Sequence, residues 1–356
     1  MDMKRDYYED IQLLGSKVLS FWFLVLSAFL VILPFLIPNY YIYMANYMAI
    51  NVIVTLGLNI LVGYTGQISL GHAGFFAIGA FTTVLSMTNL HLPFVPALLL
   101  AAFVAAFFGF ILGLPALRLK GPYLAIATLG FGMAITQVIG RWQIFGGRMG
   151  LEAPSLTLGG LFFLGSSCIL DSDRELYFLI IPIAFILTVA ARNLMKTRVG
   201  RAFIAIRDSD IAAETMGVNT VYYKTLAFAI SAFYTGIAGG LFAFLVGFIN
   251  PSTFNFILSV YFLAFVIVGG LGSIFGSVMG GIVMTWLILK LDKVQELPYL
   301  GDILSAFSER WMSGIGLPNI SSIILGLIII LIVLFEPLGL YGFWIRTKIY
   351  WKMWPF

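Results

Sequence analysis

Residues 57–80, GLNILVGYTGQISLGHAGFFAIGA, place repeated glycines, a glutamine, hydroxyl groups and a histidine inside apolar sequence. No Asp, Glu, Lys or Arg occurs between residues 18 and 117, which surround this stretch. In hydrocarbon, an irregular backbone is tolerated only where protein or a water-filled cavity satisfies its polar groups, because an unpaired one costs roughly several kcal/mol. The stretch therefore predicts a break between membrane helices that lines a transport path.

The composition predicts an all-α, polytopic integral membrane helical bundle. The 356 residues are 61% hydrophobic and 10% charged, and the mean hydropathy is +1.02. These values lie outside the range of soluble proteins. Spans of ~20 residues use up most of the chain, which leaves one domain with short connections. The single cysteine, Cys168, excludes an intrachain disulfide framework and a multi-cysteine zinc site, and the net charge of +4 gives no support for nucleic acid binding.

Apolar segments of spanning length recur along the chain, and one of them is too long to be a single helix. The predicted spans are 18–37, 41–62, 73–88, 94–114, 122–140, 176–191, 224–247 and 319–335, with the region 256–289 in addition. As one helix, 256–289 would measure ~50 Å against a hydrocarbon core of ~30 Å. It also contains VGGLGSIFGS at residues 268–277, which favours two short segments with a break between them. The expected total is about ten spans, within a range of roughly eight to ten, some of them short and interrupted.

Basic residues predict the orientation. With ten spans, both termini and the connections 115–121 and 192–224 lie on one side and carry most of the 20 Lys and Arg residues. That side is cytoplasmic by the positive-inside rule. The expected parts are a cytoplasmic segment 1–17, a transmembrane domain 18–342 and a cytoplasmic tail 343–356, in a cell (inner) membrane. The first apolar run lacks a small-residue cleavage site, so we expect it to remain as an anchor.

Two glycine-rich interruptions, 63–74 and 269–281, lie between apolar segments that are short for spanning helices, a pattern that marks the substrate path in transporters. Small residues also let helices approach closely, so Gly74, Gly79, Gly276 and Gly280 have a packing interpretation. The two interpretations weigh equally for 269–281, whereas the extra donors and acceptors of the first interruption favour the path. The candidate path residues are Tyr64, Thr65, Gly66, Gln67, Ser69, Gly71, His72, Gly270, Gly272 and Ser273. For His72, a satisfied structural role is favoured over direct contact with the solute.

The connection 192–224 is too long and too patterned for a minimal turn. Asp208, Ser209 and Asp210 supply an N-cap and first-turn charge for a short helix through Met216, and Gly217 is placed to end it. One interpretation is an amphipathic segment that lies on the lipid headgroups. The other is a docking helix for a cytoplasmic partner, and the residues alone do not decide between them.

Four segments carry a family resemblance: GYTGQISLGHAGFFAIGAF (63–81), LRLKGPYLAIATLGFG (117–132), VGRAFIAIRDSDIAAETMGVNTVYYKTLAFAISAFYTGIAGGL (199–241) and VGGLGSIFGSVMGG (268–281). They resemble the permease of branched-chain amino acid ABC importers, the LivM type, over residues 44–342. The resemblance implies two cytoplasmic ABC ATPase subunits, a second related permease and an extracytoplasmic solute-binding protein as partners. It also implies an ATPase-coupling segment that contains Gly200, Arg201, Arg207, Asp208, Glu214 and Gly217.

Two departures from the family pattern limit the resemblance. In FGGRMGL, residues 145–151, Phe145 stands where the family commonly has a threonine before the paired glycines Gly146 and Gly147. Those glycines are candidate path residues or an external turn, and the change leaves urea or a short amide open as the solute. Glu336 stands where a basic residue is usual, which affects the anchoring of the last span at the headgroups.

The chain has no sequence feature of an enzyme. It lacks a GxxxxGK[ST] phosphate loop, and its two histidines and one cysteine form no HExxH or CxxC motif, so ATP hydrolysis is expected on separate chains, with no metal or cofactor here. Apart from Lys224 at the first position of 224–247, the predicted spans contain no Asp, Glu, Lys or Arg, which an intramembrane enzyme or an ion-coupled carrier often requires. The sequence predicts an importer subunit for branched-chain amino acids, and a stand-alone carrier or channel for small polar solutes is the alternative.

Overall fold

The described part of the chain is built mainly of helices. A computed structural model describes residues 25, 29–116, 119, 121–156, 173–294, 317–336 and 338–353. The helices are α3 (Asn39–Thr65), α4 (His72–Asn89), α5 (Phe94–Ala116), α6 (Pro122–Arg141), α8 (Asp173–Lys196), α9 (Arg198–Asp208), α10 (Asp210–Thr215), α11 (Thr220–Val246), α12 (Phe256–Gly269), α13 (Ile274–Val294), α15 (Leu317–Phe335) and α16 (Gly339–Met353), with residues 29–36 also helical. The short elements are η1 (Gln143–Phe145), β1 (Leu151–Glu152), β2 (Phe248–Ile249) and η2 (Pro251–Thr253).

The observed helices confirm the all-α architecture. Within the described ranges, six helices are long and apolar enough to cross a membrane, namely α3, α5, α6, α8, α11 and residues 274–291 of α13. They coincide closely with the predicted spans because each forms from an uninterrupted apolar run. The region 256–289 is divided into α12 and α13 as predicted. The total of about ten spans stays a prediction, and half of the expected first span, 18–37, lies outside the described residues.

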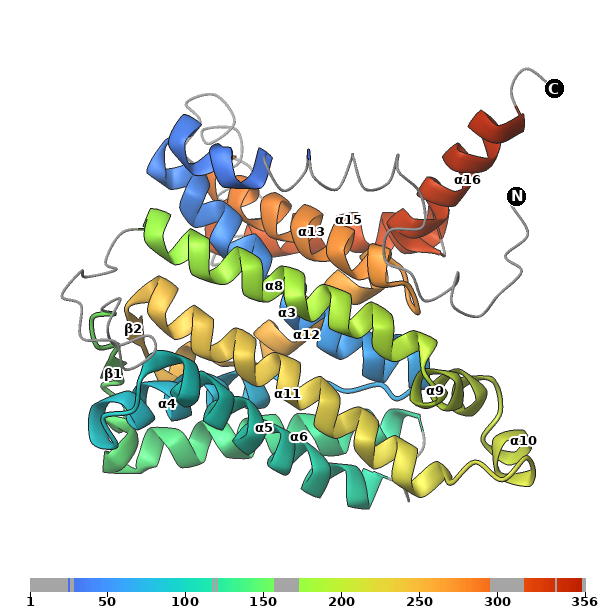
Figure 1. The fold of residues 1–356 in the computed structure, drawn as a ribbon, viewed down its shortest axis with the longest axis horizontal. Helices are drawn as coiled ribbons and strands as arrows, with labels where there is room; N and C mark the ends of the chain where they lie inside the picture. The colour runs from blue at the N-terminus through green and yellow to red at the C-terminus, as the bar shows by residue number, and fades with distance from the viewer. Residues whose placement is uncertain are drawn as a thin grey trace.

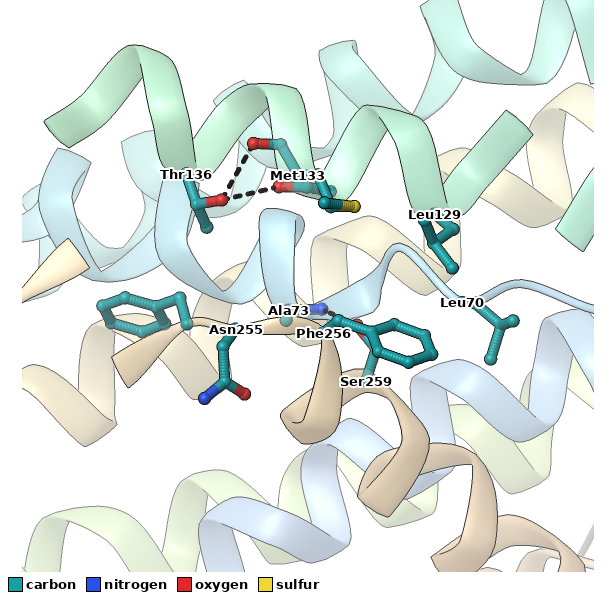
Figure 2. Close-up of a pocket in the computed structure, with 10 residues that line it drawn as sticks. Leu70, Ala73, Leu129, Met133, Thr136, Asn255, Phe256 and Ser259 are labelled. Carbon is teal, nitrogen blue, oxygen red and sulfur yellow. Dashed lines mark hydrogen bonds between the residues drawn. The ribbon is translucent and has the colours of Figure 1, made fainter. Parts of the chain in front are cut away.

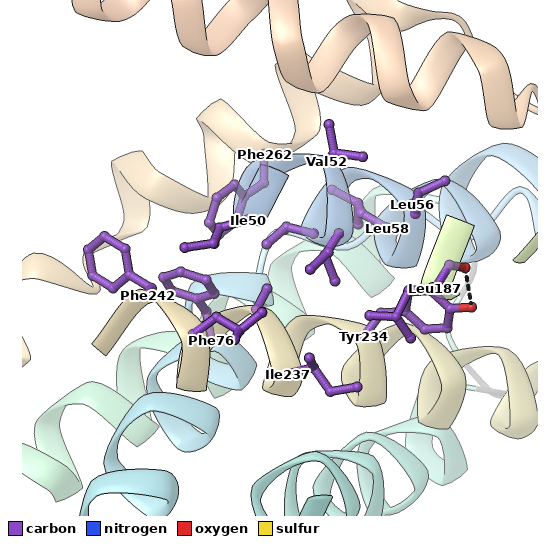
Figure 3. Packing of buried hydrophobic residues seen from close by; sticks show 14 of the residues in the cluster. Ile50, Val52, Leu56, Leu58, Phe76, Leu187, Tyr234, Ile237, Phe242 and Phe262 are labelled. Carbon is purple, nitrogen blue, oxygen red and sulfur yellow. Dashed lines mark hydrogen bonds between the residues drawn. The ribbon is translucent and has the colours of Figure 1, made fainter. Parts of the chain in front are cut away.

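Helices α3 and α11 form the centre of the bundle (Figure 1). In an 18-residue apolar stretch of each helix, 94% of the residues of α3 and 72% of those of α11 are buried. The corresponding share for α6, at the periphery, is 17%. Ile50, Leu56, Phe76 and Phe262 pack between the central helices (Figure 3). Tyr234 of α11 also reaches α8, where its hydroxyl donates a 3.0 Å hydrogen bond to the carbonyl of Leu187.

The two ends of the bundle carry different secondary-structure elements (Figure 1). Helices α9, α10 and α16 lie at one end, and the antiparallel pair β1–β2 lies at the other, with Leu151 opposite Ile249. The positively charged segments 192–207 and 346–348 therefore share one end. Most of the expected tail 343–356 is helical, since α16 runs to Met353.

Several glycines that were candidates for a packing role do lie at close helix contacts. A Cβ on Gly79 of α4 would collide with the backbone of Gly236 in α11. Gly276 and Gly280 of α13 meet the backbone at Gly269 of α12 in the same way. These positions require glycine because the helix backbones touch.

The first glycine-rich break is shorter than expected. Residues 63–65 continue α3 and α4 begins at His72, so only residues 66–71 are non-helical. The expectation of short flanking helices is wrong for α3, which has 27 residues. Gly63 lies within α3, and a Cβ there would collide with the side chain of Asn59 and the amide of Gly272. The second break is likewise limited to residues 270–273.

Candidate functional site

The first break begins where Gly66 ends α3. Gly66 adopts a left-handed conformation with φ of 71°, which glycine tolerates without steric cost. Its N–H donates to Val62 O at 3.2 Å, and the N–H of Gln67 donates to Leu61 O at 3.2 Å. These two bonds satisfy carbonyl groups at the helix end and turn the chain back into the bundle. Gly66 and Ile68 are exposed, whereas Gln67 is buried.

His72 begins α4 near the middle of α11, and both nitrogens of its ring have partners. Its Nε2 lies 2.7 Å from Ser231 Oγ, and its Nδ1 lies 3.0 Å from Ser69 Oγ. The residue is completely buried. These contacts support the structural role that was favoured for His72, since the ring is fully engaged inside the chain.

Two further hydrogen bonds attach the break to neighbouring helices. The N–H of Leu70 donates to Thr128 Oγ1 of α6 at 3.0 Å. The N–H of Ala73, in the first turn of α4, donates to Ser259 Oγ of α12 at 2.9 Å. An N–H group in the first turn of a helix has no partner within the helix, so this serine replaces a cap. The break is thereby held between α6, α11 and α12.

A small cavity lies beside the end of the break (Figure 2). We call it the Leu70 cavity; its volume is about 10 Å³, and its lining includes Leu70, Ala73, Leu129, Met133, Thr136, Asn255, Phe256 and Ser259. A larger cavity of about 500 Å³ adjoins it and shares Thr136, Phe254 and Asn255 with it. We call this one the Arg141 cavity, and Arg141, Arg148, Asn250 and Ser252 also line it. Its lining contains two cations and no carboxylate.

A third cavity lies at the α9–α10 end. This Arg207 cavity has a volume of about 310 Å³ and is lined by Thr65, Gly66, Gln67, Leu119, Gly121, Leu124, Ile206, Arg207, Asp208, Ser209, Asp210 and Lys224. Gly66 and Gln67 thus line one cavity, while Leu70 lines another. The six-residue break 66–71 lies between them.

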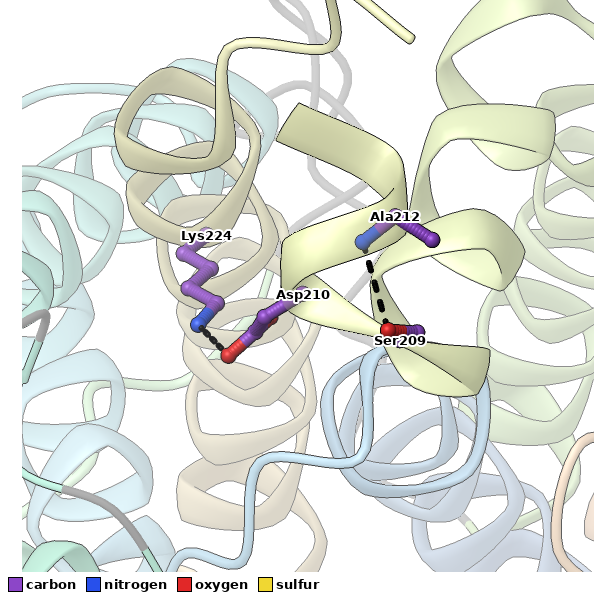
Figure 4. Close-up of polar contacts among 4 residues, drawn as sticks. All are labelled: Ser209, Asp210, Ala212 and Lys224. Carbon is purple, nitrogen blue, oxygen red and sulfur yellow. Dashed lines mark hydrogen bonds and ion pairs between the residues drawn. The ribbon is translucent and has the colours of Figure 1, made fainter. Parts of the chain in front are cut away.

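The segment 198–217 forms two helices at the same end. Ser209 caps α10, and its Oγ accepts the N–H of Ala212 at 3.3 Å (Figure 4). Asp210 accepts a 2.7 Å ion-paired hydrogen bond from Lys224 of α11. Gly217 follows the helix with φ of 82°, as its predicted terminating role requires. Ile211 and Met216 remain 75% and 83% exposed.

The second break is held by a polar side chain that the sequence analysis did not single out. Asn59 Nδ2 donates to Ser273 O at 2.9 Å and to Ser277 Oγ at 2.6 Å. Its Oδ1 accepts the N–H of Gly272 at 2.9 Å. Gly270 packs against the carbonyl of Leu338 and the Cβ of Tyr341, at the beginning of α16.

The structure brings some of the predicted path residues together and separates others. Arg207 lies beside both Gly66 and Gly272, so the two breaks and α9 meet at one place. Gly146 and Gly147 instead lie in the turn between η1 and β1, at the opposite end. Glu336 pairs with Arg346 of α16 at 2.9 Å, which accounts for an acidic residue at that position.

Several residues of the site were missed by the sequence analysis. They are Asn59, Thr128, Ser231 and Ser259, which hold the breaks, and Arg141 and Arg148, which line the largest cavity described above. The signal was present for the first four, because each is a polar residue inside an apolar helix and polar groups buried in a membrane need a partner. Their partners could not be identified from the sequence.

An apolar helix bundle with polar cavities toward both ends, separated by a short irregular segment, defines a polytopic helical membrane permease. The chain belongs to the family of branched-chain amino acid transport system permease components, whose model matches residues 40–333. The matched range includes both breaks and the segment α9–α10. It also includes the residues that line the three cavities described above. The chain is therefore a membrane subunit of a transport system.

Named relatives agree with this assignment. The high-affinity branched-chain amino acid transport system permease protein LivM of Salmonella typhimurium is 37% identical over 289 residues, which cover 76% of this chain and 68% of the relative. LivM of Escherichia coli K12 matches with the same identity and coverage. The autoinducer 2 import system permease protein LsrC of Escherichia coli is 29% identical over 205 residues, covering 56% of this chain and 55% of LsrC. No solved structure matched the chain.

Proposed function

We propose that this chain is the permease subunit of an ABC importer that moves branched-chain amino acids across the inner membrane. The observation that carries the proposal is the 37% identity to LivM over 76% of the chain, within a family match to residues 40–333. Two cytoplasmic ATPase subunits supply the energy. A second related permease completes the membrane part, and an extracytoplasmic binding protein delivers the solute.

The α9–α10 end faces the cytoplasm in this proposal. Arg198, Arg201 and Arg207 lie there, and Arg346 and Lys348 of α16 lie at the same end. Lys and Arg concentrate on the cytoplasmic side of membrane proteins, which supports this orientation. With about ten spans, the segment 1–17 and the tail 343–356 are cytoplasmic too, and residues 18–342 form the transmembrane domain.

The solute path follows the three cavities. It enters through the Arg141 cavity, reaches the Leu70 cavity beside the break 66–71, and leaves through the Arg207 cavity. The Leu70 cavity, at about 10 Å³, has room for one water molecule at most, so the path is closed there in this conformation. The break is the barrier, and the candidate residues Tyr64, Thr65, Gly66, Gln67, Ser69, Gly71 and His72 form it or support it. Gly146 and Gly147 shape the entrance at the end of the bundle that contains β1–β2. Gly270, Gly272 and Ser273, in the second break, support the barrier.

Helix α10 is the docking element for the ATPase. Ile211 in α10 and Met216 directly after the helix are exposed and offer an apolar surface. Glu214 lies between them in the sequence. The ion pair of Asp210 with Lys224 joins α10 to α11, while Arg207 of α9 contacts both breaks. A displacement of α9–α10 by the ATPase therefore reaches the barrier through direct contacts. Gly200, Arg201, Asp208 and Gly217 belong to the same coupling segment.

The proposal is tested by reconstituting the chain with the products of neighbouring genes that encode two ATPases, a second permease and a binding protein. We expect uptake of radiolabelled leucine into vesicles that depends on ATP and on the binding protein. Urea and acetamide, in excess, should leave leucine uptake unchanged. Uptake of urea or an amide in place of leucine would show that the proposed solute is wrong. Leucine flux through the chain alone would contradict the ABC mechanism.

A further inference from the structure

We propose that the Arg207 cavity is a solute-binding site for a zwitterion, in which Gln67, Arg207 and Asp208 contact the ammonium and carboxylate groups of an amino acid. This inference rests on the proposed function and adds to it a particular site and the chemistry that the site recognises. Three observations carry it: an unpartnered buried amide, a balanced pair of free charges and a cavity of sufficient size.

The side chain of Gln67 is buried without a hydrogen-bond partner. The residue is 7% exposed, and neither Oε1 nor Nε2 has a partner among the residues that the structure describes. Leaving a buried donor and acceptor unpaired costs free energy, so native structures rarely contain such groups without a functional reason. Gln67 lines the Arg207 cavity, so a rotation of its side chain would bring the buried amide to a molecule held there.

Among the described residues that line the cavity, the charges are balanced in sign. Asp210 and Lys224 also line it, and they neutralise each other through their 2.7 Å ion pair. Arg207 and Asp208 form no ion pair with any residue in the described ranges. They are consecutive residues at the end of α9 and both line the cavity, so a cation and an anion without an ion-pair partner lie next to each other there.

This combination fits an α-amino acid better than a neutral amide or an ion of one sign. The guanidinium of Arg207 can bind a carboxylate through two parallel hydrogen bonds, and the carboxylate of Asp208 can accept from an ammonium group. The amide of Gln67 provides one donor group and one acceptor for the same two charges. The volume of about 310 Å³ lies within the ~300–1,000 Å³ typical of sites for small molecules.

The position of the site gives it a role in transport. Gln67 belongs to the break that closes the path, and Gly66 of the same break lines the cavity together with Arg207. A solute that passes the barrier therefore meets these groups first. The site is the last place at which the solute binds before its release into the cytoplasm.

The first experiment separates binding from stability by replacing Gln67 in the assembled transporter. Gln67→Met keeps the length of the side chain and removes both unpaired polar atoms. We expect leucine uptake to fall by about tenfold, while the melting temperature of the purified complex stays the same or rises because no hydrogen bond is lost. Gln143→Met, an exposed glutamine at the other end, is the control and should change neither quantity.

The second experiment measures occupancy directly, using the fact that Cys168 is the only cysteine. Gln67→Cys in a Cys168→Ser background is labelled with a maleimide in inside-out vesicles. Leucine should slow the labelling at least about threefold by occupying the site. Leucinamide and 4-methylpentanoate, which each carry only one of the two charges, should protect far less.

The outcomes distinguish this inference from the proposed function. If the unsubstituted transporter imports leucine but Gln67→Met imports it equally well and leucine gives no protection, water alone fills the cavity and the inference is overturned. If 4-methylpentanoate or leucinamide protects as well as leucine, the site does not select a zwitterion. If the unsubstituted transporter imports no amino acid, the proposed function fails, and protection by leucine then decides the inference separately.

Discussion

The guanidinium of Arg207 lies directly against the backbone of Gly272. A Cβ on Gly272 would collide with Arg207 Nη1, and the Cγ of the same arginine lies 3.7 Å from the position that a Cβ on Gly66 would occupy. One side chain of α9 therefore touches both breaks, which are far apart in the sequence. Any substitution that separates these groups should disturb the breaks together.

Gly272→Ala tests this contact. The added methyl group would collide with Arg207, and φ of 76° is strained for alanine, so we expect a loss of about 1–3 kcal/mol in the free energy of unfolding. Thermal unfolding of the purified protein measures the loss. Gly130→Ala is the matched control, because nothing lies within 4 Å of that position in α6 and alanine favours the helix. Equal melting temperatures for the two variants would contradict the prediction.

Asn59→Leu should destabilise the second break. The substitution removes the partner of the Gly272 N–H and two bonds that Asn59 Nδ2 donates to Ser273 and Ser277. Leaving such buried groups unpaired costs about 1–3 kcal/mol each. We expect a lower melting temperature and faster proteolysis at residues 270–273. Asn46→Leu, which removes one hydrogen bond near the beginning of α3, should have a smaller effect. An equal loss in both variants would argue against a special role for Asn59.

Ser231→Ala should destabilise the beginning of α4. It removes the 2.7 Å partner of His72 Nε2 and leaves a buried ring nitrogen unpaired, at an expected cost of about 1–3 kcal/mol. Chemical denaturation measures this loss. Thr235→Val is the control, because the hydroxyl of Thr235 bonds only to a carbonyl of its own helix. If His72 instead contacts the solute, Ser231→Ala should alter the KM for leucine and leave unfolding unchanged.

Met216→Asp should weaken assembly with the ATPase while the permease itself stays folded. Met216 is 83% exposed beside α10, and a charge there would disrupt an apolar docking surface. Copurification of the ATPase and leucine-stimulated ATP hydrolysis should both fall by about tenfold, equivalent to a loss of ~1.4 kcal/mol in binding. Met149→Asp, at an 86% exposed methionine near β1, should leave both unchanged. Retention of the ATPase by the Met216 variant would exclude α10 as the docking helix.

Much of the fold could be predicted from the sequence, because long apolar runs and capping residues act locally. The apolar run that forms α3, the division of 256–289 into α12 and α13, and the capping of α10 by Ser209 all follow from neighbouring residues. The position of Gln67 in a break was predicted for the same reason, from the glycines around it.

The contacts that hold the site could not be predicted, because they join residues that are distant in the chain. Asn59 and Ser277 are 218 positions apart, and His72 and Ser231 are 159 positions apart. Periodicity and composition contain no information about such pairings. The lack of a partner for Gln67 is likewise a property of the folded chain, since the sequence shows the amide but not its surroundings.

The β1–β2 pair makes the two openings of the path unequal in stiffness. Main-chain hydrogen bonds tie the connection after α6 to the connection after α11, including one of 2.8 Å from the Ala153 N–H to Gly247 O. At the other opening, the tie between α10 and α11 is the partly exposed ion pair of Asp210 with Lys224, and such pairs contribute only about 0–1 kcal/mol and weaken in salt. We therefore expect the rim beside α10 to deform more easily than the rim at β1–β2 when the ATPase displaces α9–α10.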